Sequence, residues 1–230
     1  MDLSPVINQF IKNFLYLIPL LILVAIFKSS WFKGILGEFV VNISTKWLLD
    51  KNEYHLIKNV TLPTEEGTTQ IDHIIISIYG IFVVETKNMK GWIFGNASQR
   101  FWIQKIYKHS NKFQNPLHQN YKHVKTSEQL LELKDNQVYS LVVFVGNSTF
   151  KTEMPENVTS GFGYIRYIKS KKRPVFSQQE VAEIITKIEQ GRLSQSFETY
   201  RAHIKHVKTI QSQKKNIVTC PKYGSAMKLR

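Results

Sequence analysis

The sequence predicts an α/β domain with a central mixed sheet flanked by helices, preceded by an apolar N-terminal helix. Three observations support this prediction. Two β-prone runs, 71–78 and 81–84, meet at Tyr79-Gly80 and are typical of a β-hairpin. Segments with apolar residues at helical spacing lie before and after these strands. The stretch 14–27 contains no charged residue, as expected of a segment placed in a membrane.

The remaining elements follow from local signals. Apolar residues recur at helical spacing over 33–49 and 177–190, with Ser177 the expected cap of the second helix and Gly191 its end. Asn115-Pro116 is a favourable helix start, and we expect that helix to reach residue 133. The expected strands are 54–60, 68–77, 81–88, 91–95, 101–106, 138–145 and 163–168, with a loop over 62–67.

The amino-acid composition limits the classes to which the protein can belong. A chain of 230 residues, 43% of them hydrophobic, can bury a sizeable core, which excludes a wholly disordered protein. The net charge of +14 favours a polyanionic partner, nucleic acid or anionic lipid, although a merely basic, soluble surface would have the same composition. Cys220 is the only cysteine, so an intramolecular disulfide framework is excluded and a reducing compartment is compatible.

The N-terminal segment is predicted to anchor the chain in a membrane. As a helix, 14–27 would span roughly 21 Å, short of the ~30 Å hydrocarbon core, but extension back to Val6 gives about 22 residues because Lys12 can snorkel. A signal peptide and a buried helix are the alternatives; no small-x-small cleavage site follows, and the run has no polar face. Lys28 and Lys33 follow the span. We therefore expect a single pass through the cell or inner membrane over residues 6–27, with the rest in the cytoplasm.

Acidic and basic side chains gather on one face of the predicted hairpin. Alternate residues of a strand face the same way, so Glu85 and Lys87 share a face. With the turn centred on Tyr79-Gly80, Asp72 lies opposite Lys87, and opposed residues point the same way. Two carboxylates and an ammonium are what a divalent metal beside a phosphate requires. A surface ion-pair cluster is the alternative.

This region resembles the nuclease-related (NERD) domain, which is similar to the PD-(D/E)xK superfamily of metal-dependent nucleases. The resemblance covers about half the chain, residues 34–150. It implies a restriction-endonuclease-like core of PD-(D/E)xK type and hydrolysis of phosphodiester bonds in nucleic acid. The matching stretches, in order, are Gly37-Glu38, Asn59 to Pro63, Gly67 to His73, Tyr79 to Asn88, Gly91 to Gly95, Trp102, Asn115 to Asn120 and Val142 to Phe144.

The resemblance also implies roles for individual residues. Mg²⁺ or Mn²⁺ prefers hard oxygen donors, and the implied protein ligands are Asp72, Glu85, the carbonyl of Thr86 and Glu38. Lys87 would position the attacking water or offset charge on the phosphate. Gln119, on the following helix, would orient the substrate or a carboxylate. No small-molecule cofactor is expected.

Other polar residues near this site are interpreted as structural. Asn115 is expected to cap its helix and to have no catalytic role. His118 and His123 are expected at the surface or at a phosphate, since no partner spacing supports zinc. His73, which alternates away from Asp72, is expected to be packed or hydrogen-bonded.

Basic and aromatic residues downstream are candidates for contacting nucleic acid, DNA more than RNA. Phosphate contacts by Lys and Arg are independent of sequence and weaken steeply with salt; solvated loops are the alternative. Trp92, Phe101 and Trp102 could stack on bases, but large aromatic residues near a sheet are usually core. The basic candidates are Lys105, Lys108, Lys112, Lys122, Lys171, Lys172 and Arg173.

We divide the chain into an anchor (1–30), the nuclease-related domain (34–150), a strand and helix packed on it (151–198) and a basic tail (199–230). The tail resembles half of a topoisomerase-type zinc finger, with Tyr223 where the second cysteine would be. Structural zinc needs four ligands, so we expect no zinc.

The function expected from these features is that of a membrane-tethered, metal-dependent nuclease. Two alternatives keep the fold: a nucleic-acid-binding module without catalysis, and a membrane-associated scaffold whose charge engages anionic lipid.

Overall fold

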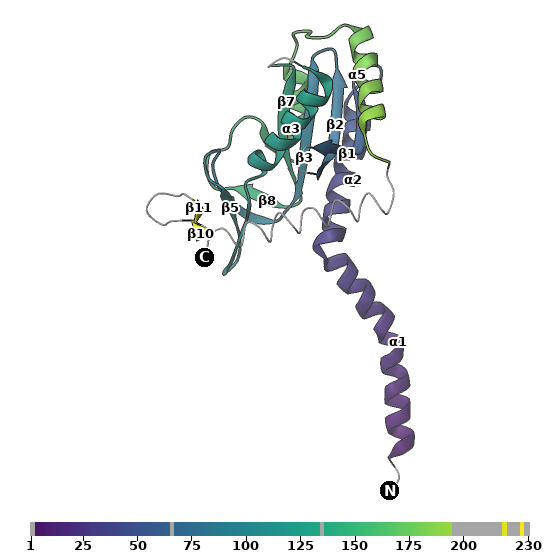
Figure 1. Ribbon diagram of the computed structural model, residues 1–230. Helices are drawn as coiled ribbons and strands as arrows, with labels where there is room; N and C mark the ends of the chain where they lie inside the picture. The colour runs from purple at the N-terminus through teal and green to yellow at the C-terminus, as the bar shows by residue number, and fades with distance from the viewer. Residues whose placement is uncertain (1–2, 65–66, 134–135, 195–217, 220–225, 228–230) are drawn as a thin grey trace.

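A five-stranded mixed sheet is the centre of the protein (Figure 1). The computed structural model describes residues 3–64, 67–133, 136–194, 218–219 and 226–227. In spatial order the strands are β1 (His55–Thr64), β2 (Gly67–Ser77), β3 (Gly80–Asn88), β7 (Val138–Val145) and β9 (Val158–Ser160). The first three run antiparallel, and β3, β7 and β9 run parallel to one another.

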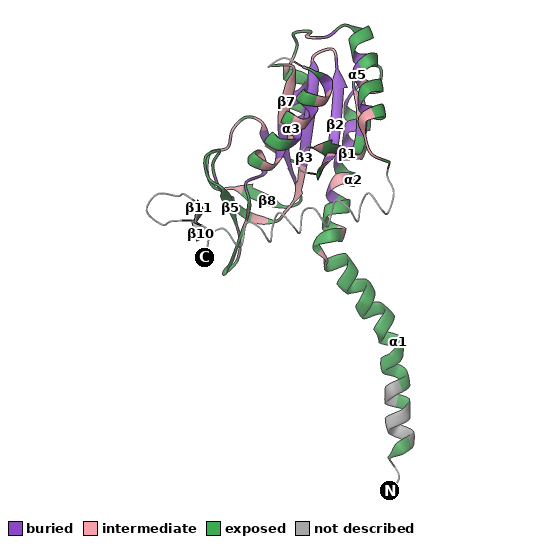
Figure 2. Ribbon diagram, in the orientation of Figure 1, coloured by how far each residue is buried: buried purple, intermediate pink, exposed green. Residues whose placement is uncertain are grey.

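Helices cover both faces of this sheet. α3 (Pro116–Leu131) and α5 (Gln178–Gly191) pack on one face, and α2 (Ser30–Leu48) and α4 (Gly163–Ser170) pack on the other. The central strands are therefore buried on two sides, as Figure 2 shows. This explains why 74–76 and 81–84 are continuous apolar runs instead of alternating ones. The mixed α/β fold predicted from the sequence is confirmed.

A second sheet adjoins the first. It contains β4 (Gly91–Phe94), β5 (Phe101–Ile106), β6 (His109–Gln114) and β8 (Ser148–Phe150), in the order β6-β5-β4-β8. Ile93 and Trp102 are fully buried on its inner side, where Trp102 stacks on Phe144 of β7 with ring centroids 6.1 Å apart. A short pair, β10 (Val218–Thr219) and β11 (Ala226–Met227), lies near the C-terminus. Cys220 and Tyr223, the zinc-finger remnant, lie outside the described residues.

The N-terminal helix α1 (Ser4–Lys28) extends away from the domain, and its residues from 12 to 28 are exposed (Figure 2). Ser29 separates it from α2 and caps α2 by accepting a hydrogen bond from the Phe32 amide. Among the described residues, no helix taken singly has both the length and the apolar character to cross a membrane. Residues 12–28 and 30–48, bent by 58°, meet that test only as a pair. The predicted transmembrane helix therefore stays a prediction.

Two local predictions were wrong. The expected loop over 62–67 is mostly strand, since β1 and β2 remain paired as far as Thr64 and Gly67. Pro63 is tolerated there because β1 is the edge strand of the sheet. The expected strand at 163–168 is helix α4, whose buried residues Tyr164, Ile165 and Ile168 follow helical spacing.

Five short strands were not predicted: β6, β8, β9, β10 and β11. β6 has the sequence HSNKFQ, five of its six residues are exposed, and it offers no apolar alternation. β8 and β9 have three residues each, too few to show a period. The cap of α5 is confirmed: the Ser177 side chain accepts a hydrogen bond from Glu180 N, and the Ser177 amide donates one to Glu180 Oε2.

Gly37 lets α2 approach β3 and β7 closely. A Cβ built there would lie 2.9 Å from Asn88 Cβ and 3.1 Å from Val145 Cγ2. We therefore predict that Gly37→Ala lowers the free energy of unfolding by about 1–3 kcal/mol through overpacking, measured by urea denaturation.

Gly34→Ala is the matched control on the same helix, because a Cβ there meets nothing within 4 Å. It should raise stability by up to ~1 kcal/mol through helix propensity. Equal effects of the two substitutions would contradict the close approach at Gly37.

Candidate functional site

In the β2–β3 hairpin, the strand pairing is shifted by two residues from the register that the sequence predicted. Ser77 lies opposite Gly80, and the ladder runs from there to His73 opposite Val84. A shift of two residues keeps each paired residue on its expected face, because side chains alternate with a period of two. It changes the neighbours, however: the next position beyond the ladder sets Asp72 against Glu85, where the sequence predicted Lys87.

Asp72 lies where the ladder between β2 and β3 ends. Its carboxylate oxygen Oδ2 accepts a hydrogen bond of 2.8 Å from the backbone amide of Thr86. The side chain thus replaces the backbone carbonyl that would continue the sheet. Burial, and then the negative charges of Glu85 and Glu38, raise the pKa of Asp72 well above its ordinary range. The Thr86 amide and Lys87 only partly oppose this rise.

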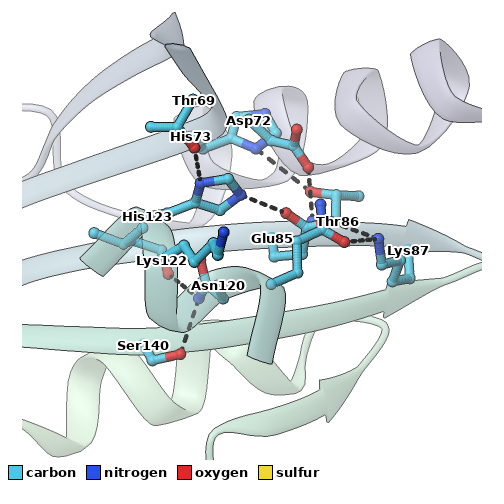
Figure 3. Close-up of polar contacts among 12 residues, drawn as sticks. Thr69, Asp72, His73, Glu85, Thr86, Lys87, Asn120, Lys122, His123 and Ser140 are labelled. Atoms are coloured by element: carbon cyan, nitrogen blue, oxygen red, sulfur yellow. Dashed lines mark hydrogen bonds and ion pairs between the residues drawn. The ribbon is translucent and has the colours of Figure 1, made fainter. Parts of the chain in front are cut away.

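Glu85 is buried at this end of β3, and its two carboxylate oxygens face different side chains (Figure 3). Lys87 Nζ donates to Oε1 at 2.5 Å, and His123 Nε2 of α3 lies 3.4 Å from Oε2, within ion-pair range. Burial would raise the pKa of Glu85, but the charge of Lys87 and the proximity of His123 outweigh it and hold that pKa below its ordinary value. Glu85 is therefore ionised at neutral pH.

Glu38 brings a third carboxylate from α2. It follows Gly37, whose close contact with β3 and β7 positions this turn of the helix. Burial, and then the charge of Glu85, raise the pKa of Glu38. Three carboxylates from α2, β2 and β3 therefore repel one another across a poorly solvated region.

The oxygen atoms at this site are of the type that a hard divalent cation prefers as ligands. Within the described ranges, no three His, Cys, Asp or Glu side chains stand close enough together to hold a metal ion. Mg²⁺, however, keeps several water ligands and often uses only one or two carboxylates. A cation would also relieve the mutual repulsion that raises the pKa of Asp72 and of Glu38. The ligand set of Asp72, Glu85, Glu38 and the Thr86 carbonyl therefore stays a prediction.

Helix α3 brings further polar groups to the site. Gln119 Oε1 accepts a hydrogen bond of 3.0 Å from Lys87 Nζ, so Lys87 is held between Gln119 and Glu85. Asn120 Nδ2 donates to the Val83 carbonyl at 2.8 Å and to Ser140 Oγ at 2.9 Å, and so fastens α3 across β3 and β7 (Figure 3). The position of Gln119 beside Lys87 depends on this attachment.

His123 was wrongly expected at the surface. It is 5% exposed, and its Nδ1 lies 2.8 Å from Thr69 Oγ1 of β2 while Nε2 faces Glu85. Its spacing of four residues from Gln119 is the sequence signal that could have placed both on one face. Asn120, which the sequence analysis did not single out, is fully buried in the same contact region.

The predicted helix cap at Asn115 and the predicted packed position of His73 are confirmed. Asn115 caps α3 by accepting a hydrogen bond from the Leu117 amide at 2.9 Å. His73 is fully buried, and burial lowers its pKa to about 4. His118 is exposed and lies 2.9 Å from the Ala97 carbonyl through Nε2.

The predicted basic contacts fall in separate places. Lys171, Lys172 and Arg173 follow α4 and adjoin the turn end of β3, because the Val175 and Phe176 amides donate to Ile78 O. Five residues of strand, about 17 Å, separate that end from Glu85. The structure therefore does not bring them to the carboxylates. Exposed positions on the β5–β6 hairpin and on the outer side of α3 carry the others, Lys105, Lys108, Lys112 and Lys122.

The aromatic residues divide between core and surface. Trp102 is fully buried, as expected of a core residue. Trp92 and Phe101 are each 48% exposed, so the expectation that they belong to the core was wrong.

Comparison with known proteins identifies the region that carries this site. The model of the nuclease-related domain matches residues 33–145, which include most of α2, the hairpin, α3 and β7. An uncharacterized protein of Bacillus anthracis is 49% identical over 117 residues, which cover 50% of this chain and 54% of that protein. A crystal structure of a protein of unknown function aligns over 78% of this chain and 99% of its own, with 11% identity and a TM-score of 0.30.

The pairing of Lys87 with buried Glu85 makes a prediction about stability. Lys87→Ala leaves a buried carboxylate without its cation, and we expect a loss of roughly 2–4 kcal/mol in unfolding free energy, below the full cost of breaking a buried pair because Lys87 is partly exposed. Urea denaturation with EDTA present measures it.

Lys125→Ala is the control, since Lys125 pairs with Glu128 on the outer side of α3 and its side chain is 48% exposed. It should cost less than ~1 kcal/mol. The double variant Glu85→Gln/Lys87→Ala should recover part of the loss. A Lys87→Ala cost as small as the control's would contradict the pairing.

Proposed function

Because the chain belongs to the nuclease-related domain family through residues 33–145, we propose that it is a metal-dependent nuclease tethered to a membrane. The observation that carries this proposal is the gathering of Asp72, Glu85 and Lys87 at one end of the central sheet, beside Gln119 and Glu38. Perturbed carboxyl groups that share a confined region are more frequent at functional sites than elsewhere. The substrate class is nucleic acid, in keeping with the net charge of +14.

Each residue of the site has a role that its contacts support. Asp72 and Glu85, with Glu38, supply negative charge for Mg²⁺ or Mn²⁺, which would polarise the phosphate and lower the pKa of a bound water. Lys87 offsets charge that develops on the phosphate. Gln119 holds the Lys87 ammonium in position through its 3.0 Å hydrogen bond. His123 orients the Glu85 carboxylate from the α3 side.

One observation favours a binding module without catalysis. Glu85 already has two basic partners, Lys87 and His123, so its carboxylate is engaged within the protein itself. In that alternative the same residues stabilise the fold, and the basic surface alone contacts nucleic acid. The two functions differ in whether phosphodiester bonds are cut.

Cleavage assays separate these functions. The purified chain is incubated with single- and double-stranded DNA and RNA, with Mg²⁺, with Mn²⁺ and with EDTA. We expect cleavage only with metal, reduced about 10²-fold or more by Asp72→Asn, Glu85→Gln or Lys87→Ala, because each removes a metal ligand or a charge next to the phosphate. Salt-sensitive binding should remain.

Glu128→Gln, an acid on the outer side of α3, is the control and should cleave like the parent. Thermal melting of every variant excludes unfolding as the cause of a loss. Binding without cleavage in all conditions would replace the nuclease by the binding module. Cleavage by the Glu85→Gln/Lys87→Ala double variant at the parent's rate would remove the assigned site.

Membrane tethering is part of the proposal. Apolar side chains of α1 from Phe14 to Phe27 are exposed, and Phe27 at its end also contacts Phe32 of α2, with ring centroids 4.8 Å apart. On α2, exposed apolar residues recur at intervals of four: Trp31, Ile35, Phe39, Ile43 and Trp47. Apolar surface of this extent is rare on a soluble monomer and marks an interaction site.

Cell fractionation tests the tether. We expect the full chain in the membrane fraction, resistant to salt and alkaline carbonate and released by detergent. Leu21→Arg should shift it toward the soluble fraction, because a charge near the middle of a span costs about 2.5–3.5 kcal/mol. Lys12→Arg, which keeps the charge near the end of α1, should not. Release of the parent by salt alone would point to a charge-held surface contact.

A further inference from the structure

The outer face of the second sheet combines exposed aromatic and basic side chains. Along β5, Phe101, Ile103 and Lys105 are exposed, whereas Trp102 between them is fully buried. Cross-strand pairing sets Trp92 of β4 directly opposite Lys105. Directly opposed residues share a face, so this surface, which we call the outer face, includes Trp92, Phe101, Ile103 and Lys105.

Cations lie against the exposed rings. Lys151 Nζ is 4.8 Å from the centroid of the Trp92 ring, and Lys105 Nζ is 6.0 Å from it. Arg100 Cζ lies 5.3 Å from the centroid of the Phe101 ring. On β6, Lys112 lies opposite Ile103 and so adds another positive charge to the outer face. The strands β4, β5, β6 and β8 contain no Asp or Glu. The outer face is therefore complementary to a polyanion that also presents flat apolar groups.

We propose that the outer face binds single-stranded nucleic acid by stacking bases on Trp92 and Phe101, with Lys105, Lys112 and Lys151 paired to phosphates. Unpaired bases offer aromatic faces that a duplex keeps buried in its own stack, so a sheet face with exposed rings suits a single strand. The inference rests on nucleic acid as the substrate in the proposed function. It adds a site distinct from the carboxylates and names the form of the substrate.

A hollow of about 530 Å³ borders this face. Phe94 and Ile103, which oppose each other across β4 and β5, form part of its wall. Gln99 and Glu153 line it as well. An amide and a carboxylate suit the edge of a base better than a phosphate, because a carboxylate accepts hydrogen bonds from exocyclic amino groups and repels phosphate. The hollow is placed to receive a base displaced from the strand on the outer face.

Binding is measured with the full chain in detergent and EDTA, so that cleavage plays no part. The probes are an end-labelled oligothymidylate and a blunt DNA duplex of equal length, followed by fluorescence anisotropy. Stacking contributes roughly 5- to 150-fold in affinity per base. We expect Trp92→Ala/Phe101→Ala to weaken oligothymidylate binding by at least about 10-fold and duplex binding far less. Trp92→Phe should retain most of the affinity because it keeps an aromatic ring.

Phe162→Ala is the matched control, since Phe162 is 61% exposed but lies at the start of α4, outside the second sheet. It should bind like the parent, as should Asp72→Asn, which removes only the proposed metal site. Asp72→Asn therefore separates the two proposals: loss of cleavage with intact strand binding supports both.

Three results would overturn the inference. Unchanged oligothymidylate binding by Trp92→Ala/Phe101→Ala would remove the stacking site and leave the nuclease proposal to its own cleavage assay. An equal loss for duplex and single strand would reduce the outer face to a phosphate contact. Loss of binding to phosphatidylglycerol vesicles, with oligonucleotide binding intact, would assign the outer face to a lipid surface.

Discussion

The buried negative charge of Glu85 is the constraint on which this end of the protein depends. An ionised carboxylate away from water must be compensated, and here the Lys87 ammonium does so at Oε1, while His123 Nε2 lies 3.4 Å from Oε2. Lys87 lies on the same strand as Glu85 and His123 lies on α3, so these contacts require a fixed distance between α3 and the sheet. Asn120 sets that distance through hydrogen bonds to β3 and β7. The Asn115 cap sets where the helix begins.

The other acidic residues around Glu85 destabilise this region. Asp72 and Glu38 face the charge of Glu85, and burial adds to the cost of ionising them. A purely structural site would be expected to replace such groups with apolar ones of similar volume, which is often neutral or stabilising. Perturbed carboxyl groups in a confined region are more frequent at functional sites than elsewhere, which agrees with the proposed cation site.

The sequence predicted the larger features because they depend on strong local signals. The apolar runs of β2, β3 and β7 and the Ser177 cap were placed closely, since burial on both faces and capping chemistry leave clear patterns. The register of the hairpin was not, because a turn at Tyr79-Gly80 and one starting a residue earlier differ little in sequence. His123 and the exposed Trp92 could not be placed either, since neither a buried histidine nor a surface tryptophan follows the usual trend of its residue type. Their environment depends on how α3 and the second sheet dock, which is a tertiary matter.

Ser29 is the one residue between two helices that together extend over most of the first 48 residues. Because a single residue connects the two helices, the orientation of α1 is transmitted to α2. Rotation of α1 about its long axis would carry the whole domain around that axis, whereas a flexible linker would not transmit the rotation. Whatever holds α1 therefore also governs which side of the domain looks outward. The orientation of α1 therefore determines the orientation of the carboxylates and of the outer face.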